Sequence, residues 1–82
     1  MKIKCAAIRR KSGQVFEGKN HAVCFLLMKE AGVPRLAARR SMCGFVTDTG
    51  KFVNRHRAAE IAHKAGQIKK LKIYLYSEDL KG

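Results

Sequence analysis

The stretch GFVTDTGKFVNRHRAAEIAHKAGQI, residues 44–68, predicts a β-hairpin followed directly by a helix. Apolar residues lead into and out of TDTG, whose Asp, Thr and Gly are typical of a tight turn between antiparallel strands. Asn54 stands where a helix cap is expected, and apolar residues then recur at helical spacing from Ala58 to Ala65. Gly66 is typical of the residue that follows a helix. The stretch therefore predicts strand, turn, strand and helix in succession.

The N-terminal part of the chain repeats this order in a looser form. Residues 2–10 and 14–18 predict two strands joined by the turn KSGQ. In the first strand, simple alternation places Ile3, Cys5 and Ala7 on one face. A second β-hairpin is therefore expected ahead of the first.

Residues 20–32 predict a helix that Asn20 caps and Gly32 closes. Its side chains from Ala22 to Met28 are apolar nearly all round, so more than one side of the helix needs a cover. A subunit interface would provide that cover, and so would a sheet that wraps a central core helix. The sequence leaves both alternatives open, and we expect a homo-oligomer.

The remaining segments predict a connection and a last strand. Residues 33–42 contain the only Pro and predict a connection with a short helical turn. After residue 66, alternation through Leu71, Ile73 and Leu75 predicts a C-terminal strand that ends at SED. The expected fold is α+β: a small antiparallel sheet of two hairpins and this C-terminal strand, packed with two α-helices.

Length and composition limit the domain count and the compartment. The 82 residues form one predicted domain, residues 1–82. No apolar run approaches the roughly 20 residues of a membrane helix, and the N-terminus has no signal-peptide core. The three Cys without a CxxC motif indicate free thiols in a reducing cytosol. We therefore expect a cytoplasmic protein that does not associate with membranes.

The charge of the chain points to an anionic partner. Eighteen basic and 6 acidic residues give a net charge of +12. Such a charge concerns partners rather than fold, and it suggests nucleic acid, a nucleotide or an acidic protein surface. A merely solubilising basic surface is the plainer interpretation of the same composition.

The sequence predicts neither an enzyme nor a cofactor. DTG at residues 48–50 resembles the aspartic-protease signature, but a hairpin turn explains all three residues. Cys24 lies three residues after His21, in an apolar run that would raise its pKa and leave it inert. No second ligand pair joins these two residues to complete a metal site. We predict no catalytic residue and no metal site.

The cations at the start of the second helix suggest an anion site. Arg55, His56 and Arg57 oppose the helix dipole there, at a cost of about 0.3–1 kcal/mol each. A bound phosphate reverses the sign of this effect, because free N–H groups and Arg side chains then hold it together. We therefore expect these three side chains to gather around one phosphate, with Asn54 contacting a base edge or a ribose hydroxyl.

Further contributions come from outside this turn. Further charge would come from His21, Lys19, Arg9 and Arg10 if the two helix starts lie close together. Phe45 and Phe52 flank a turn, so they are the aromatic residues best placed to stack on a base. The predicted ligand-binding set is Arg55, Arg57, Asn54, His56, Phe45, Phe52, His21 and Arg9.

Residues 44–68, together with AAIRRKSGQVFEG and SEDL, resemble a motif of small phage and prophage proteins. Its usual form reads G-F-[VL]-T-[DS]-x-G-R-F-V-D-R, then an Ala- and Ile-rich helix, A-G-Q-I and S-E-D-L. Arg55 matches the motif, whereas Lys51 replaces its usual Arg and Asn54 its usual Asp. The group is similar to the first family of Thoeris anti-defence sponge proteins.

This resemblance implies a fold, a ligand class and a setting. The sponge proteins are small β-plus-two-helix proteins that oligomerise. They bind cyclic ADP-ribose isomers, and some bind cyclic oligonucleotides, which they sequester without cleaving them. The resemblance therefore implies a phage-encoded immune-evasion protein in the cytoplasm of the host bacterium.

Two other functions fit the same charge. One is a basic nucleic-acid binder or an anti-CRISPR-type inhibitor that docks on nucleic acid or an effector complex. The other is a basic inhibitor that docks on an acidic enzyme surface. Salt separates the first from a nucleotide pocket, because binding to a duplex weakens steeply with ionic strength.

Overall fold

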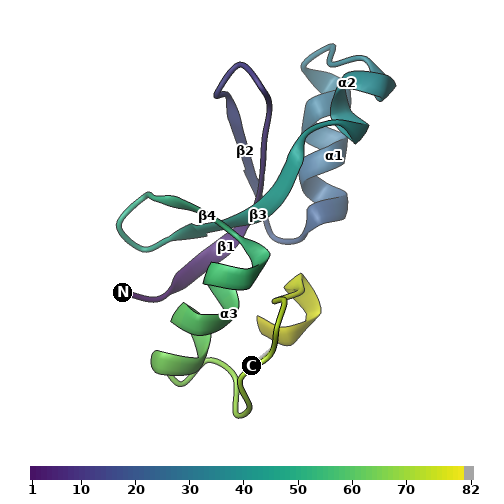
Figure 1. Cartoon of the computed structure of the whole chain (residues 1–82). Helices are drawn as coiled ribbons and strands as arrows, with labels where there is room; N and C mark the ends of the chain where they lie inside the picture. Colours follow the sequence, from purple (N-terminus) through teal and green to yellow (C-terminus); the bar gives the residue numbers. More distant parts are fainter. Residues whose placement is uncertain (81–82) are drawn as a thin grey trace.

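The computed structural model describes residues 1–80 and has an α+β fold, as the sequence predicted (Figure 1). Its strands are β1 (Ile3–Arg9), β2 (Val15–Gly18), β3 (Met42–Thr47) and β4 (Phe52–Asn54). Its α-helices are α1 (His21–Glu30), α2 (Arg35–Arg39) and α3 (Arg55–Lys64), and a 3₁₀ helix η1 (Ser77–Leu80) follows. Among these elements, no helix is long and apolar enough to cross a membrane.

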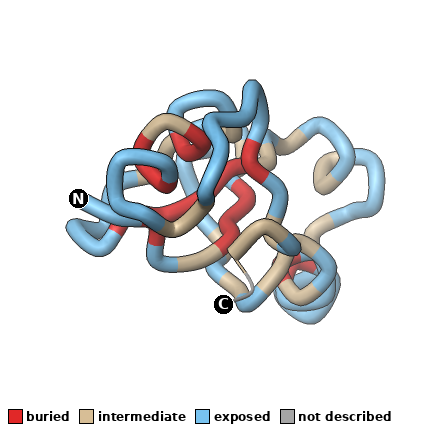
Figure 2. Tube along the Cα trace, turned by 90° about the horizontal axis from the view of Figure 1, so that it is seen from below, coloured by how far each residue is buried: buried red, intermediate tan, exposed pale blue. Residues whose placement is uncertain are grey.

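The four strands form one antiparallel sheet in the order β2-β1-β3-β4. Both predicted hairpins are confirmed, and the pairing of β1 with β3 joins them into one sheet. Cys24 and Met28 of α1 share a single core with Ala58 and Ile61 of α3. Figure 2 shows the buried segments running through the middle of the molecule, surrounded by exposed turns.

The helix ends follow the sequence predictions. The Asn20 side chain accepts a hydrogen bond from Val23 N in α1, at 2.9 Å. The Asn54 side chain accepts one from Arg57 N in α3, at 2.7 Å. Gly66 follows α3 with a φ of 75°, which only glycine adopts without strain. The two Asn caps fix both helix starts directly beside the strands that precede them.

The predicted alternation in β1 is wrong, because the strand contains a bulge. Ile3 pairs with Thr47 while Cys5 pairs with Val46, so that Lys4 is an extra residue in the ladder. One extra residue reverses the faces on its two sides. The core face of β1 therefore carries Ile3, Ala6 and Ile8 rather than Ile3, Cys5 and Ala7.

The predicted C-terminal strand does not form within the described residues. Residues 68–76 are irregular, η1 follows, and we call residues 68–80 the C-terminal arm. Leu75 is fully buried and its backbone N–H donates to Arg55 O, at 3.0 Å. Leu71 and Ile73 are 60% and 70% exposed, so only one of the alternating apolar side chains reaches the core.

Helix α1 is not wrapped by the sheet, so the alternative of a central core helix is wrong. Cys24 and Met28 are its buried residues. Phe25, Leu26 and Leu27 remain 40%, 55% and 37% exposed. The subunit interface that would cover them stays a prediction.

Gln67 closes the sheet beside the bulge. β2 pairs with β1 only from Ala6 onward, so the backbone of Ile3 has no partner from β2. The Gln67 side chain accepts from Ile3 N and donates to Ile3 O, both at 2.8 Å. Its amide therefore occupies the place of a neighbouring peptide group.

Replacing Gln67 with Ala should lower the free energy of unfolding by about 1–3 kcal/mol, because two part-buried backbone groups lose their partner. Gln67→Glu should also destabilise at neutral pH, since a carboxylate cannot donate to Ile3 O. Urea denaturation measures both. Gln14→Ala is the control, because Gln14 is exposed and its side chain bonds only the Arg10 side chain, at 3.3 Å. Equal stability of Gln67→Ala and the unaltered protein would refute the closing role.

Candidate functional site

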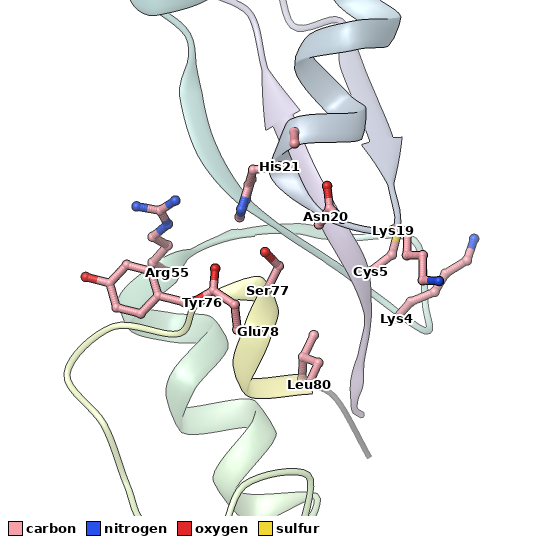
Figure 3. Close-up of a pocket in the computed structure, with 11 residues that line it drawn as sticks. Lys4, Cys5, Lys19, Asn20, His21, Arg55, Tyr76, Ser77, Glu78 and Leu80 are labelled. Carbon is pink, nitrogen blue, oxygen red and sulfur yellow. The ribbon is translucent and has the colours of Figure 1, made fainter.

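A pocket of about 630 Å³ lies between the sheet, the starts of α1 and α3, and the C-terminal arm (Figure 3). Its volume is typical of sites for small molecules. It contains three cations and one carboxylate among its side chains. The lining residues are Lys4, Cys5, Lys19, Asn20, His21, Ala22, Arg55, Tyr76, Ser77, Glu78 and Leu80.

Local features of the chain bring these residues together. Lys4 comes from the bulge of β1, and Arg55 is the first residue of α3. Only Lys19 and Asn20 separate β2 from α1. Gly18 permits this short connection, since a Cβ there would lie 3.0 Å from the Val23 side chain. Both helix starts therefore open toward the same pocket.

Arg55 forms one wall of the pocket with Tyr76. Its guanidinium carbon lies 5.1 Å from the centre of the Tyr76 ring, within the range of a cation–π contact. The Nε of Arg55 is buried and has no hydrogen-bond partner among residues 1–80. A buried donor without an acceptor is costly, so an acceptor supplied by a ligand would stabilise this arrangement.

His21 is held in place beside Arg55. Its Nε2 lies 2.9 Å from the carbonyl oxygen of Gly44, which can only accept, so Nε2 donates. The ring meets Phe45 edge-on at a centroid distance of 5.2 Å. Burial lowers the pKa of His21, and the nearby Arg55 lowers it further, although the Gly44 hydrogen bond opposes both. His21 is therefore neutral at pH 7 and adds no charge to the pocket.

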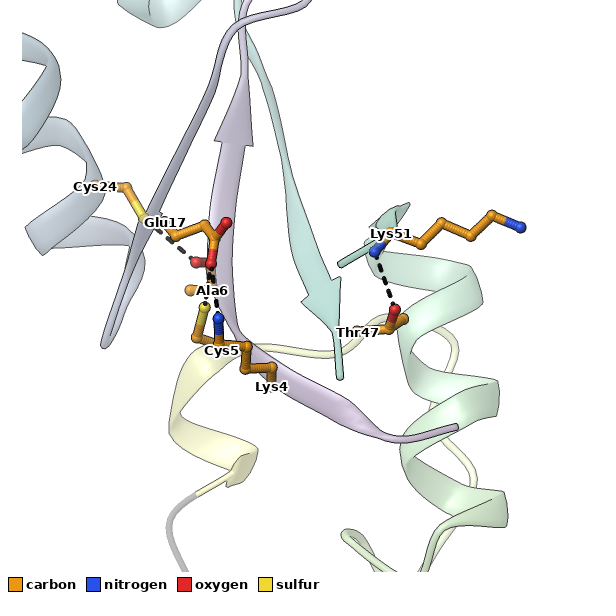
Figure 4. A network of polar contacts seen from close by, with 7 residues as sticks. All are labelled: Lys4, Cys5, Ala6, Glu17, Cys24, Thr47 and Lys51. Carbon is orange, nitrogen blue, oxygen red and sulfur yellow. Dashed lines mark hydrogen bonds and ion pairs between the residues drawn. The ribbon is translucent and has the colours of Figure 1, made fainter. Parts of the chain in front are cut away.

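The opposite side of the pocket carries Lys4, Cys5 and Lys19, with Glu17 just outside the lining. Lys4 Nζ lies 3.4 Å from Glu17 Oε1, in an exposed pair of small energetic value (Figure 4). The Cys5 thiol lies 3.6 Å from the same oxygen. Burial raises the pKa of Cys5, and the Glu17 carboxylate raises it further. Cys5 is therefore a thiol, and not a thiolate, at neutral pH.

Cys24 is a core residue whose thiol is unreactive. It is fully buried, and its Sγ lies 3.6 Å from Ala6 O (Figure 4). Burial raises its pKa to about 11. These values confirm the prediction that its apolar surroundings raise its pKa.

The three cations predicted to gather around one phosphate point in different directions. Only Arg55 lines the pocket. His56 Nδ1 lies 3.0 Å from Ile73 O, and Arg57 Nη1 lies 3.9 Å from Glu60. Consecutive helical residues are about 100° apart around the axis, so three in a row do not converge at one point. Arg55 and His21 do line the same pocket, because the starts of α3 and α1 lie close together.

The other predicted site residues lie elsewhere. Phe45 is fully buried in the core, so it offers no face to a base, contrary to the sequence prediction. Phe52 is half-buried, and the Arg9 guanidinium lies 5.0 Å from its ring centre, away from the pocket lining. Asn54 uses its side-chain oxygen for the α3 cap. The aromatic residue that does border the pocket is Tyr76.

Sequence reasoning missed Lys4, Tyr76, Ser77 and Glu78 as members of the site. Lys4 depends on the bulge, which simple alternation does not reveal. The other three depend on the arm returning to α3.

Comparison with known protein families matches residues 2–80 to the family described as Phage T4 y16D protein. No curated protein and no solved structure matches the chain. The family match includes every residue that lines the pocket, so the whole site lies within the shared region.

Proposed function

This chain belongs to the phage T4 y16D protein family, and on that premise we propose that it captures a phosphate-bearing nucleotide in the pocket. The captured molecule is a signal of the host, held without cleavage in the host cytoplasm. The resemblance to the Thoeris anti-defence sponge proteins suggests a cyclic ADP-ribose isomer or a cyclic oligonucleotide. The chain acts as a stoichiometric binder and not as an enzyme.

The unpartnered Nε of Arg55 is the observation that carries this proposal. A phosphate oxygen is a strong acceptor for an Arg donor, and the contact is charge-assisted. Lys4 and Lys19 stand in the same lining and supply further positive charge. The pocket therefore offers an anion positive charge, and Arg55 retains a donor that the described residues leave unused.

The remaining lining favours a nucleotide over a bare phosphate. The exposed Tyr76 ring already stacks with Arg55, so the two provide a flat surface for a base. Glu78 is the one carboxylate in the lining, and it would repel a simple anion. A base or ribose brings N–H and O–H donors that this carboxylate can accept. The mixture of cations and one acid thus suits a ligand that has both phosphates and donors.

Binding without cleavage fits the chemistry of the same residues. Cys5 is the thiol in the lining, and its raised pKa keeps it protonated and weakly nucleophilic. The imidazole of His21 is engaged with Gly44 O and does not stand beside a nucleophile. These features support retention of the ligand over chemical attack on it.

The experiment is isothermal titration calorimetry of the protein with cyclic ADP-ribose isomers, cyclic oligonucleotides, linear ADP-ribose and inorganic phosphate. We expect tight binding of at least one cyclic nucleotide and none of phosphate. Arg55→Ala should weaken that binding about 10- to 100-fold, the loss of one charge-assisted hydrogen bond. Mass spectrometry of the released ligand should recover it intact.

Arg57→Ala is the matched control, since Arg57 lies on the same turn of α3 but pairs with Glu60 outside the pocket. It should bind within about twofold of the unaltered protein, well under 1.4 kcal/mol. Circular dichroism confirms that both variants fold. Equal loss in both variants would mean that general charge and not the pocket binds the ligand. Failure of every nucleotide to bind the unaltered protein would overturn the proposal.

A further inference from the structure

We propose that a second basic site, separate from the pocket, binds the phosphate backbone of a nucleic acid strand. The site is a groove of about 340 Å³ between the β1–β2 turn and α2, which we call the basic groove. Arg10 and Lys11 stand on one wall and Arg40 on the other. Figure 1 shows α2 and the β1–β2 turn at one end of the molecule, and α3 and the C-terminal arm at the other.

The cations around the basic groove are not neutralised by the protein. Within residues 1–80, the acids that form ion pairs do so with Lys4, His56, Arg57 and Lys72, all outside this region. Residues 31–47 contain no Asp or Glu. Arg10, Lys11 and Arg40 line the groove, and their sequence neighbours Arg9, Arg35 and Arg39 likewise form no ion pair within residues 1–80.

These charges are spread over a surface rather than directed at one point. Arg35 and Arg39 are four residues apart on α2, so they lie on one side of that helix. Arg9 lies on the neighbouring β1, where it pairs with Met42. Cations distributed over the groove and its surroundings suit a polyanion with repeating phosphates, whereas a single phosphate needs convergent donors.

The basic groove rests on a fixed backbone. Arg10 N donates to Gln14 O at 2.8 Å, and Gly13 N donates to Arg10 O at 2.9 Å, which holds the β1–β2 turn. On the other wall, Ser41 Oγ donates to Ala37 O at 3.0 Å and ties the end of α2. The cations are thus presented by two held segments, which lowers the entropy cost of contacting a strand.

The lining contains little that reads bases. It has no aromatic side chain, no Asn or Gln and no acid; its other members are small or apolar, with Leu36 60% exposed. Contacts to phosphate position a nucleic acid but carry no sequence information. We therefore assign sequence-independent binding to this site, dominated by counterion release.

Fluorescence anisotropy with labelled single-stranded and duplex oligonucleotides of mixed sequence, at several salt concentrations, tests this assignment. Contact with about four phosphates should give a log–log salt slope near −3 to −4. The double variant Arg10→Glu/Arg40→Glu, which changes one cation on each wall, should weaken binding at least tenfold and reduce the slope by about 2. The strand type bound more tightly at the same salt concentration is the preferred form of the ligand.

Lys69→Glu/Lys70→Glu makes the same change in net charge on the arm, away from the basic groove, and should weaken binding far less. If the Arg10→Glu/Arg40→Glu protein does not fold, the milder variant Arg10→Gln/Lys11→Gln on one wall should reproduce the loss. Arg55→Ala should leave nucleic acid binding unchanged, which keeps this test independent of the nucleotide pocket. Equal effects of the groove and arm variants, or no binding at low salt, would overturn the assignment.

Discussion

Replacing Gly44 with Ala should destabilise the protein by at least about 3 kcal/mol, which for a domain of this size means a fall in Tm of more than about 10 °C. A Cβ at position 44 would fall on the carbonyl oxygen of Val53 and lie 2.6 Å from Cζ of the Phe52 ring. The phenyl group can move, but the carbonyl belongs to the β3–β4 ladder and cannot yield without separating the two strands. Since β4 leads directly into α3, the pocket would lose Arg55 as well. Thermal unfolding followed by circular dichroism measures the effect.

Gly50→Ala is the control for Gly44→Ala, because it strains the backbone without creating a steric clash. Gly50 has a φ of 85°, and a Cβ there meets nothing within 4 Å. Its replacement should cost only about 1–2 kcal/mol, the strain of the left-handed conformation. If Gly44→Ala were no less stable than Gly50→Ala, the close approach of β4 to Gly44 would be wrong.

Leu75→Ala should cost about 2–5 kcal/mol, the usual loss for a fully buried leucine. Leu75 joins the same core as Ala58, Ala59 and Ala62 of α3, whose small side chains leave room for it. Without the leucine, the C-terminal arm loses its one buried anchor, and Tyr76 and Glu78 leave the pocket. Nucleotide binding and stability should therefore fall together, measured by calorimetry and urea denaturation on the same protein.

Ile73→Ala is the control for the arm. Ile73 is two residues away but 70% exposed, so its replacement should change stability by less than about 0.5 kcal/mol. Comparable losses for the two variants would show that the arm is not anchored by Leu75 in solution.

Most of the fold follows from local sequence signals. The turn TDTG, the two Asn caps and Gly66 each act within a few residues, so chain order alone places both hairpins and both long helices. The bulge at Lys4 and the irregular arm depend on distant partners instead. The Lys4 bulge belongs to the β1–β3 ladder. The course of the arm depends on the space beside α3, which accepts the Leu75 side chain but not those of Leu71 and Ile73.

The candidate site was predicted in part for the same reason. The charge at the α3 start drew attention to Arg55, which lines the pocket, and His21 lines it too because the two helix starts lie close together. The helical rotation between Arg55 and its two neighbours was overlooked, and so the convergence of three cations was wrong. Tyr76 and Glu78 reach the pocket only because the arm folds back toward α3. The alternating apolar residues 71, 73 and 75 led instead to the prediction of a strand.

The sparse attachment of the C-terminal arm has a consequence for how a ligand enters. One backbone–backbone hydrogen bond, from Leu75 N to Arg55 O, joins residues 68–80 to the rest of the described chain. Segments with so few protected amides exchange hydrogen through local opening, well below the free energy of global unfolding. We therefore expect the arm to open before the sheet and the two long helices do. We expect a nucleotide wider than the pocket mouth to enter by this opening, and its binding to slow amide hydrogen exchange in the arm.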